Sequence, residues 1–367
     1  MNKRKLASVR RVKAIRAIPD ADMIEVVTVD GWDVVSQKAV GHKVGDLVCY
    51  FEIDSFLPVR EEFEFLRKGC YRSIEGLGEG FRLRTIKLRG QVSQGLIIPL
   101  RELDIENKDS LEEYDDLTEV LGVIKFDPPI PTQLQGEVKG NFPGFVSKTD
   151  QERIQNIYYQ AHLGQMYEAS LKLDGSSMTV YGKTQKSEPF DNGDAIIQIE
   201  ECITGVCSRN MDYKINAVNE SNSFVRIYHK YDLANKLKEA IAFFGFDMAV
   251  QGELMGPGIQ GNREKLSEHE FFVYSVFNIN TQKYLLSSER RKVVAFLGLK
   301  HVPIIEIINL QGFSIDDMLG WVANVTKEPI DGIQWNKIPE GVVFKSVETP
   351  ENSFKVINNT FLLKCEE

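Results

Sequence analysis

Residues 166–183 read MYEASLKLDGSSMTVYGK, and this stretch decides the fold of the larger part of the chain. Short runs of strand-forming residues on either side of Asp174-Gly175 predict two β-strands joined at the glycine. The strand that ends at Lys172 would project its amine into a cleft. Asp174, two positions later, would point in the same direction as the lysine.

A lysine in this position favours nucleophilic chemistry. A free lysine amine has a pKa of about 10.4, and burial or neighbouring cations lower that pKa and make the amine reactive. Asp174 could orient a ribose or reach a metal ion. A surface Lys–Asp ion pair beside a turn glycine is the alternative, because short motifs recur by chance.

Further segments follow Lys172 in a fixed order. They are Ser208–Asn210 (SRN), Gln251–Gly256 (QGELMG), Phe271–Phe277 (FFVYSVF), Glu340–Lys345 (EGVVFK) and Ser353–Lys364 (SFKVINNTFLLK). With the Lys-x-Asp-Gly segment, they resemble the ordered motifs of the covalent lysine nucleotidyltransferases, the superfamily of DNA ligases, RNA ligases and mRNA capping enzymes. The resemblance predicts an enzyme that binds ATP and transfers AMP to Lys172.

The resemblance also implies roles for individual residues. The predicted catalytic residues are Lys172 (the nucleophile), Asp174, Glu253, Glu340, Lys355 and Lys364, of which the three carboxylates would bind Mg²⁺ or Mn²⁺. The predicted ATP-binding residues are Lys172, Arg153, Gly175, Arg209, Phe272, Lys355 and Lys364. Phe272 would stack on adenine, and Arg209 could also contact RNA. Family members usually carry Lys-x-Lys in the last motif, so the lysine that fills the second role stays open.

The N-terminal part predicts a different fold. Short β-branched stretches between residues 5 and 100, broken by turn residues, indicate a small β-barrel of the OB type. Arg82, Arg84, Lys87 and Arg89 make one of its basic segments and are candidate RNA contacts. An acidic and then Pro- and Gly-rich stretch follows. We predict a barrel over 1–120, a linker over 121–147 and a nucleotidyltransferase domain over 148–367.

The predicted fold class is therefore α+β. The second domain would be of the ATP-grasp-like ligase type with antiparallel sheets. Helices are expected from a capping signature at Thr149-Asp150, over 228–244, and at about 289–298 and 314–325. The chain from 340 to 364 is expected to return to strands.

A barrel that precedes the catalytic domain resembles the fifth RNA ligase family, a nick-sealing branch. This resemblance implies an ATP-dependent RNA ligase acting on RNA, or on a nicked duplex whose 3'-hydroxyl strand ends in RNA. An ATP-dependent DNA ligase, a capping-type guanylyltransferase and a non-enzymatic OB-fold RNA-binding protein with a decayed site remain alternatives.

Composition is compatible with this interpretation. The 367 residues include 43% hydrophobic and 26% charged residues and carry a net charge of −9. The basic runs are therefore local, set within an acidic chain. Five scattered cysteines predict free thiols, and the absence of a long apolar run predicts no membrane segment. We expect a monomeric, cytoplasmic protein.

Overall fold

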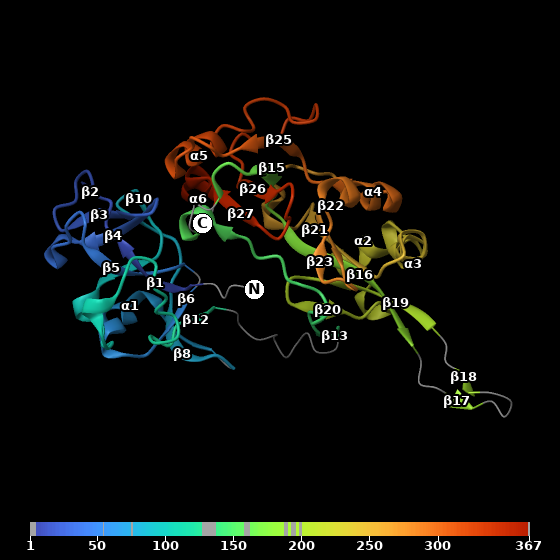
Figure 1. The fold of residues 1–367 in the computed structure, drawn as a ribbon, viewed down its shortest axis with the longest axis horizontal. Coiled ribbons are helices and arrows are strands. Elements are labelled where there is room, and N and C mark those ends of the chain that lie inside the picture. Colours follow the sequence, from blue (N-terminus) through green and yellow to red (C-terminus); the bar gives the residue numbers. More distant parts are fainter. Residues whose placement is uncertain are drawn as a thin grey trace.

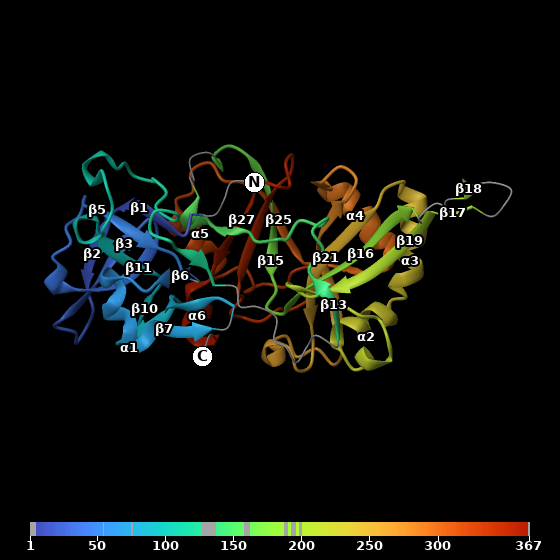
Figure 2. The same ribbon diagram turned by 90° about the horizontal axis from the view of Figure 1, so that it is seen from below.

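The computed structural model describes residues 5–53, 55–74, 76–126, 137–157, 162–186, 190–191, 196–197 and 200–365. Figure 1 shows an N-terminal body, coloured blue, beside a larger body that runs from green to red. Figure 2 shows that the sheet containing β15, β25 and β27 lies between the N-terminal body and the strands of a larger sheet.

The N-terminal body is a small antiparallel β-barrel. Its elements are β1 (Ala7–Arg11), β2 (Ala14–Ala17), β3 (Ile24–Val29), β4 (Trp32–Gln37), β5 (Leu47–Phe51), β6 (Ser55–Pro58), α1 (Arg67–Cys70), β7 (Tyr71–Ile74), β8 (Gly78–Arg82), β9 (Ile86–Leu88), β10 (Gln91–Ser93), β11 (Leu96–Pro99) and β12 (Ile124–Lys125). Alternate residues of these strands point inward, as the period of two requires. Val9, Phe51, Leu57 and Phe81 are buried together in its main core.

The chain leaves the barrel after β12. This short strand pairs with β6 of the barrel, whereas β13 (Val138–Asn141) pairs with β20 (Met211–Tyr213) of the larger body. Lys125 is therefore held on the barrel, and the residues from 137 onward belong to the larger body. Cys49, Cys70, Cys202 and Cys207 are free thiols.

The larger body contains two main sheets. Its remaining strands are β14 (Glu152–Arg153), β15 (Met166–Lys172), β16 (Ser176–Lys186), β17 (Phe190–Asp191), β18 (Ile196–Ile197), β19 (Glu200–Cys207), β21 (Met248–Met255), β22 (Glu270–Asn278), β23 (Lys283–Tyr284), β24 (Lys300–His301), β25 (Ile304–Asn309), β26 (Gly341–Ser346) and β27 (Ser353–Ile357). The larger sheet has the order β13-β20-β19-β16-β21-β22-β23, with β24 beside β22. The smaller sheet has the order β14-β27-β26-β15-β25. Pairing is antiparallel apart from β14–β27 and β22–β24, which are parallel.

Four helices pack on the sheets, namely α2 (Ser223–Lys230), α3 (Leu233–Phe244), α4 (Ser287–Leu297) and α5 (Ile315–Val322). A fifth, α6 (Asn359–Cys365), follows β27, contacts β10 of the barrel and brings Phe361 to the cavity between the sheets. Val225, Leu237 and Val293 bring α2, α3 and α4 into the core of the larger sheet. Met318 packs α5 on the smaller sheet. No helix in the described part of the chain is long and apolar enough to span a membrane.

Several sequence-based expectations need correction. The single helix expected over 228–244 is two helices, because Asp232 adopts a left-handed conformation (φ 50°) that ends the first. The helix expected at Thr149-Asp150 is absent. Glu152–Arg153 pairs instead with β27, and a short 3-10 turn follows over Ile154–Asn156. The chain end expected as a strand is β27 followed by α6.

The lysine segment itself forms the two predicted strands, but they do not pair with each other. β15 pairs with β25 and β26, whereas β16 pairs with β19 and β21. Gly175 lies at the crossing from one sheet to the other, where a β-carbon would come within 2.5 Å of the Leu254 carbonyl oxygen. This crossing places Lys172 and Asp174 between the two sheets.

Candidate active site

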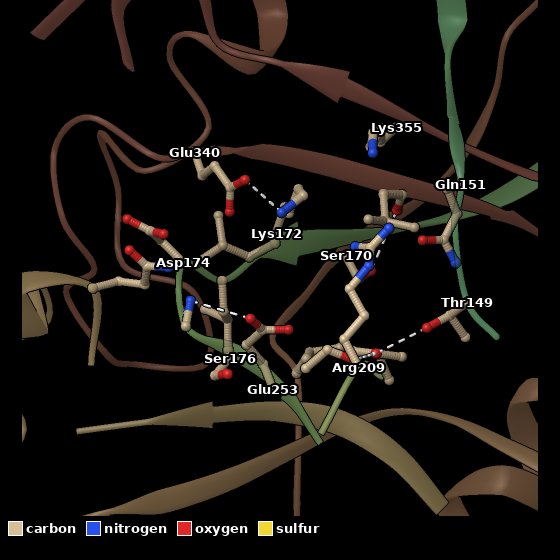
Figure 3. A pocket seen from close by; sticks show the side chains of 18 of the residues that line it. Thr149, Gln151, Ser170, Lys172, Asp174, Ser176, Arg209, Glu253, Glu340 and Lys355 are labelled. Atoms are coloured by element: carbon tan, nitrogen blue, oxygen red, sulfur yellow. Dashed lines mark hydrogen bonds and ion pairs between the residues drawn. The ribbon is translucent and has the colours of Figure 1, made fainter. Parts of the chain in front are cut away.

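A cavity of about 950 Å³ opens between the two sheets at this crossing. Seven of the ten predicted catalytic and ATP-binding residues line it, namely Lys172, Asp174, Gly175, Arg209, Glu253, Glu340 and Lys355. Figure 3 shows that they divide into two groups, with Lys172 and the three carboxylates at one end and Arg209 and Lys355 at the other. The cavity therefore has an acidic end around the lysine and a basic end.

Lys172 is held by carboxylates rather than by cations. Its Nζ lies 2.5 Å from Oε1 of Glu340. Burial lowers the pKa of Lys172, but the charges of Glu340 and Glu253 outweigh burial, so the pKa is raised above its ordinary value. The expected depressed pKa is therefore wrong for the protein without a nucleotide or metal, and the amine is held protonated.

Glu253 and Asp174 lie close enough to Glu340 for its charge to raise their pKa values. Burial, followed by the charge of Glu340, raises the pKa of Glu253 to about 8 against the opposing effect of Lys172. The Gly175 N–H donates to Oε1 of Glu253 over 3.2 Å. Burial and Glu340 also raise the pKa of Asp174, which Arg263 contacts at 3.5 Å. The acidic end therefore has three carboxyl groups, Asp174, Glu253 and Glu340, against two basic groups, Lys172 and Arg263.

This excess of carboxyl groups fits a divalent cation. The second carboxylate oxygen of Glu340 is buried without a hydrogen-bond partner, although buried carboxylate oxygens are normally paired. Among the described residues, no three Asp, Glu, His or Cys side chains lie close enough to hold a metal ion by themselves. Additional oxygen ligands would have to come from a nucleotide or water, which is the usual situation for Mg²⁺.

The basic end is organised around Asp150. Its carboxylate forms ion pairs with Lys125 and with Nη2 of Arg209, the latter at 3.4 Å. Burial raises the pKa of Asp150, but the charges of Lys355, Lys125 and Arg209 hold it at about 2. Arg209 is positioned by the turn between β19 and β20, and Lys355 by β27.

Tyr274 lines the cavity, as does Phe361 of α6, whereas Phe272 does not. Tyr274 and Phe272 lie on β22 and face the same cluster, but Phe272 is only 6% exposed and meets Trp335 edge-on at 6.0 Å. The Tyr274 hydroxyl lies 3.0 Å from the hydroxyl of Thr149. Phe272, which was expected to stack on adenine, is therefore separated from the cavity by its contact with Trp335, a residue far from it in the sequence.

Other predicted residues lie outside the cavity. The Arg153 guanidinium lies over the ring of Trp32 at 5.1 Å, where the barrel meets the larger body. Lys364 lies on α6, and its side chain is outside the described residues.

The basic segment of the barrel also lies away from the cavity. Arg82 stacks on Phe126 at 4.0 Å, while Arg84 and Arg89 are exposed. Lys87 lies on β9, and its side chain is outside the described residues.

Two basic residues of the cavity wall were not predicted as site residues. Arg263 pairs with Asp174 and donates to the Ile338 carbonyl oxygen over 2.6 Å. It comes from the β21–β22 connection, where no sequence pattern marks it. Buried Lys345 donates to the Tyr274 carbonyl oxygen over 2.6 Å and to the Ser275 hydroxyl over 2.7 Å. Burial lowers its pKa strongly. The sequence feature that could have identified Lys345 is the presence of a lysine within an apolar strand.

Comparison with known proteins agrees with this arrangement. A model of an OB-fold domain matches residues 6–100 and confirms the predicted barrel type. A model of the RNA ligase family matches residues 165–357, which is more than half of the chain. A search among curated proteins finds no match.

Solved structures give a similarity over nearly the whole chain. The RNA ligase of Naegleria gruberi, solved with PPi, is 37% identical, with 99% of each chain covered and a TM-score of 0.74. A lysine-to-methionine variant of that ligase with AMP and Mn is 37% identical, with 99% of each chain covered and a TM-score of 0.75. A lysine-to-alanine variant with ATP and Mn is 36% identical, with 99% of each chain covered and a TM-score of 0.74. With its family model, its two-body fold and its lysine cavity in agreement, the chain belongs to the RNA ligase family.

Proposed function

We propose that this RNA ligase uses ATP and a divalent cation to join RNA ends through a lysyl-AMP intermediate on Lys172. The observation that carries the proposal is the cavity that holds Lys172 and its carboxylates at one end and Arg209 and Lys355 at the other. The solved Naegleria gruberi ligase variants with ATP and Mn, and with AMP and Mn, support the choice of nucleotide and metal.

The reaction would proceed in three steps. Lys172 Nζ loses a proton and attacks the α-phosphorus of ATP, so that an N–P bond forms and pyrophosphate leaves. An oxygen of the RNA 5'-phosphate then attacks the lysyl-AMP phosphorus, the N–P bond breaks and the amine regains a proton. Finally the 3'-hydroxyl attacks the 5'-phosphorus, a phosphodiester forms, and AMP leaves with the bonding electrons.

The residues of the chain would perform separate tasks in these steps. Asp174, Glu253 and Glu340 would hold the divalent cation together with oxygens of the nucleotide. When bound, that cation would neutralise phosphate charge and oppose the carboxylates that keep Lys172 protonated. Lys355 would approach the α-phosphate from the opposite end of the cavity.

We further propose that Tyr274 is the residue that faces adenine. It is one of two aromatic side chains in the cavity wall, and its hydroxyl is anchored between Thr149 and Ser177. The other, Phe361, has the Arg263 guanidinium over its ring at 4.6 Å.

The barrel, which includes β12 up to Lys125 and so extends past the expected end at 120, would bind the RNA, with the exposed Arg84 and Arg89 near phosphates. The nucleotidyltransferase domain, which includes β13 and so begins before the expected start at 148, would carry out the chemistry.

The substrate preference can be tested by sealing of defined nicks. We expect faster sealing when the 3'-hydroxyl strand ends in ribonucleotides than when it is all DNA, because recognition of the A-form shape and 2'-hydroxyls favours RNA. Sealing rates are measured on matched nicks that differ in the sugars at the junction. Equal rates would indicate a DNA ligase, and labelling of the protein by α-labelled GTP in place of ATP would indicate a guanylyltransferase.

Glu253→Gln should lower the adenylation activity and raise the thermal stability at pH 8. Since the folded-state pKa of Glu253 is raised to about 8 from an ordinary value of 4.5, its contribution to stability is lost progressively as pH rises between these values. The amide can still accept from the Gly175 N–H. We expect adenylation to fall strongly while the melting temperature at pH 8 rises by about 2 °C or more.

Thermal unfolding at pH 5 and pH 8, beside adenylation assays, checks this expectation. The rise in melting temperature should be smaller at pH 5, where Glu253 of the parent protein is largely protonated. A lower melting temperature at pH 8 would show that the Glu253 charge stabilises the fold.

A further inference from the structure

A second cavity, of about 410 Å³, adjoins the main one. Its wall is formed by Ser176, by residues 222–224 at the start of α2, and by residues 258–260 of the β21–β22 connection. Ser176 and Gln260 also line the main cavity. Figure 3 shows Ser176 at the end where Lys172 and the carboxylates lie. This second cavity, called the α2 groove below, therefore opens beside the acidic end of the active site.

The α2 groove is polar but uncharged. No charged side chain of the described residues lines it. Its polar groups are the amides of Asn222 and Gln260 and the hydroxyls of Ser176 and Ser223, beside the ring of Phe224. A phosphate is usually bound by cations, whereas amides, hydroxyls and an aromatic ring suit the sugar and base of a nucleoside. The volume of the groove lies within the range of about 300–1,000 Å³ that is usual for small-molecule sites.

The amide of Asn222 is used only in part by the helix. Its oxygen accepts from the Phe224 N–H over 2.9 Å and from the Val225 N–H over 3.4 Å, so these N–H groups of α2 are already capped. Within the described part of the chain, the amide nitrogen of Asn222 and the side chains of Ser176 and Gln260 form no hydrogen bond. The groove therefore offers unused amide and hydroxyl groups to a neutral ligand.

The backbone of Gln260 is strained. Its φ of 42° lies in the left-handed region, which a glutamine rarely adopts, between Gly258 at 81° and Gly261 at 66°. Strain of this kind is concentrated at functional sites, where the surrounding structure maintains it. Here it holds Gln260 where the two cavities meet, because Gln260 lines both of them.

We propose that the α2 groove binds the ribose of the 3'-terminal nucleotide of the RNA strand, with the amides of Asn222 and Gln260 recognising its 2'-hydroxyl. The proposal rests on the RNA ligase function. The 2'-hydroxyl is the group that distinguishes RNA from DNA at a given position, and an amide can both donate to it and accept from it. The α2 groove would therefore determine the preference for RNA at the last nucleotide of this strand.

The position of the groove also favours this end of the strand. Asp174 and Glu340 at the acidic end would repel a phosphate that has no bound cation. The ribose at a 3'-hydroxyl terminus is the uncharged end of an RNA strand. Bound in the groove, it would direct its 3'-hydroxyl toward the Lys172 end of the main cavity, where the last step takes place.

The ribose of ATP is the competing source of the same chemistry, because it also carries a 2'-hydroxyl. ATP binds in the first step, whereas the 3'-hydroxyl strand reacts in the last step. Assays of the separate steps, each with a ligand that has or lacks the 2'-hydroxyl, therefore distinguish the two.

The first variant to test is Asn222→Asp. Aspartate keeps the oxygen that caps α2 but replaces the amide nitrogen with an acceptor. Its melting temperature should equal or exceed that of the parent protein, because a negative charge is favourable at a helix N-terminus. Asn309→Asp is the matched control. The Asn309 oxygen likewise accepts a backbone N–H, that of Gln311 at 2.8 Å, and Asn309 is exposed and lines neither cavity.

The second variant is Gln260→Gly. Glycine adopts a positive φ without strain, so this variant removes the amide while relieving the backbone. A loss of RNA recognition in a protein that is no less stable would separate ligand binding from folding.

The first measurement is single-turnover sealing by full-length adenylated protein. Two nicked duplexes are compared that differ only in the 3'-terminal sugar, ribose or 2'-deoxyribose. The parent protein should seal the ribose nick faster, and Asn222→Asp and Gln260→Gly should each lower the ratio of the two rates about threefold to tenfold, as for one lost hydrogen bond. Asn309→Asp should keep the parent ratio. An unchanged ratio in both groove variants would show that the 2'-hydroxyl is recognised elsewhere.

The second measurement is independent of activity. Binding of the same two nicks is compared with ATP omitted. The parent protein should bind the ribose nick more tightly, and the groove variants should reduce that preference by a similar factor. Equal binding and equal sealing of the two nicks by the parent protein would overturn the proposal. Failure of the parent protein to form lysyl-AMP would instead contradict the proposed function, and the binding comparison would still test the groove.

Adenylation with ATP and with 2'-deoxyATP tests the competing ligand. The groove variants should lose more discrimination between the two nicks than between the two nucleotides. If Asn222→Asp lost discrimination between the nucleotides but kept the parent ratio for the nicks, the groove would hold the ribose of ATP, and the proposal would be wrong.

Discussion

Lys172→Met is expected to abolish formation of the protein–AMP adduct. The variant removes the one nitrogen that the β15–β16 crossing places beside Glu340, 2.5 Å from its carboxylate. Without a nucleophile no N–P bond can form, so sealing that depends on ATP should also stop. Intact-mass measurement after incubation with ATP and Mg²⁺ checks the adduct, and peptide mapping locates it in the parent protein.

Lys172→Arg is the matched control for charge. An arginine keeps a cation against Glu340 and Glu253, but a guanidinium stays protonated and does not act as a nucleophile. It should therefore fold like the parent protein and still form no adduct. An adduct in either variant, or peptide mapping to Lys345 or Lys355, would show that another lysine is the nucleophile.

The fold could be predicted from the sequence where a local pattern decides it. The strands Met166–Lys172 and Ser176–Lys186 lie on either side of Asp174-Gly175, where short runs of strand-forming residues predicted them. The helix expected at Thr149-Asp150 does not form. A capping signature indicates only where a helix could begin, and it does not determine the conformation of the residues that follow. The conformation of the next residues is decided by pairing of Arg153 with Lys355, which lies far away in the sequence.

The site could be predicted where a motif fixes the backbone. Lys172, Asp174 and Gly175 lie at one crossing, and the crossing requires a glycine because the Leu254 carbonyl is so close. Residues that reach the site only through packing of distant segments are not marked by a sequence motif. The cover of Phe272 by Trp335 and the approach of Arg263 to Asp174 depend on segments far apart in the sequence.

The pKa of Lys172 was the feature of the site that could least be predicted from the sequence. Residue types alone show that carboxylates accompany Lys172, but not whether they or burial dominate its pKa. The distance of 2.5 Å to Glu340 decides in favour of the carboxylates. The carboxylates around Lys172 therefore raise its pKa, and Glu340 is the one that contacts the amine directly.

Glu340→Gln separates the two effects of this carboxylate on Lys172. Adenylation should fall at least about a hundredfold, because a carboxylate ligand of the divalent cation is lost. In the absence of ATP and metal, however, the reactivity of Lys172 should increase. The Glu340 charge raises the lysine pKa, so the neutral amide lowers that pKa and increases the neutral amine fraction at pH 7.

Two measurements on the same samples check these opposite changes. Adenylation by ATP is followed by mass, and the intrinsic reactivity of Lys172 by its rate of labelling with a small amine-specific acylating reagent between pH 7 and 9. Glu268→Gln is the matched control, because Glu268 also pairs with a lysine, Lys230 at 3.2 Å, but lies outside the cavity. It should leave both rates at the parent values. If Glu340→Gln slowed acylation as much as adenylation, Glu340 would hold the lysine in position, and a role in binding the cation would no longer be needed to explain the loss.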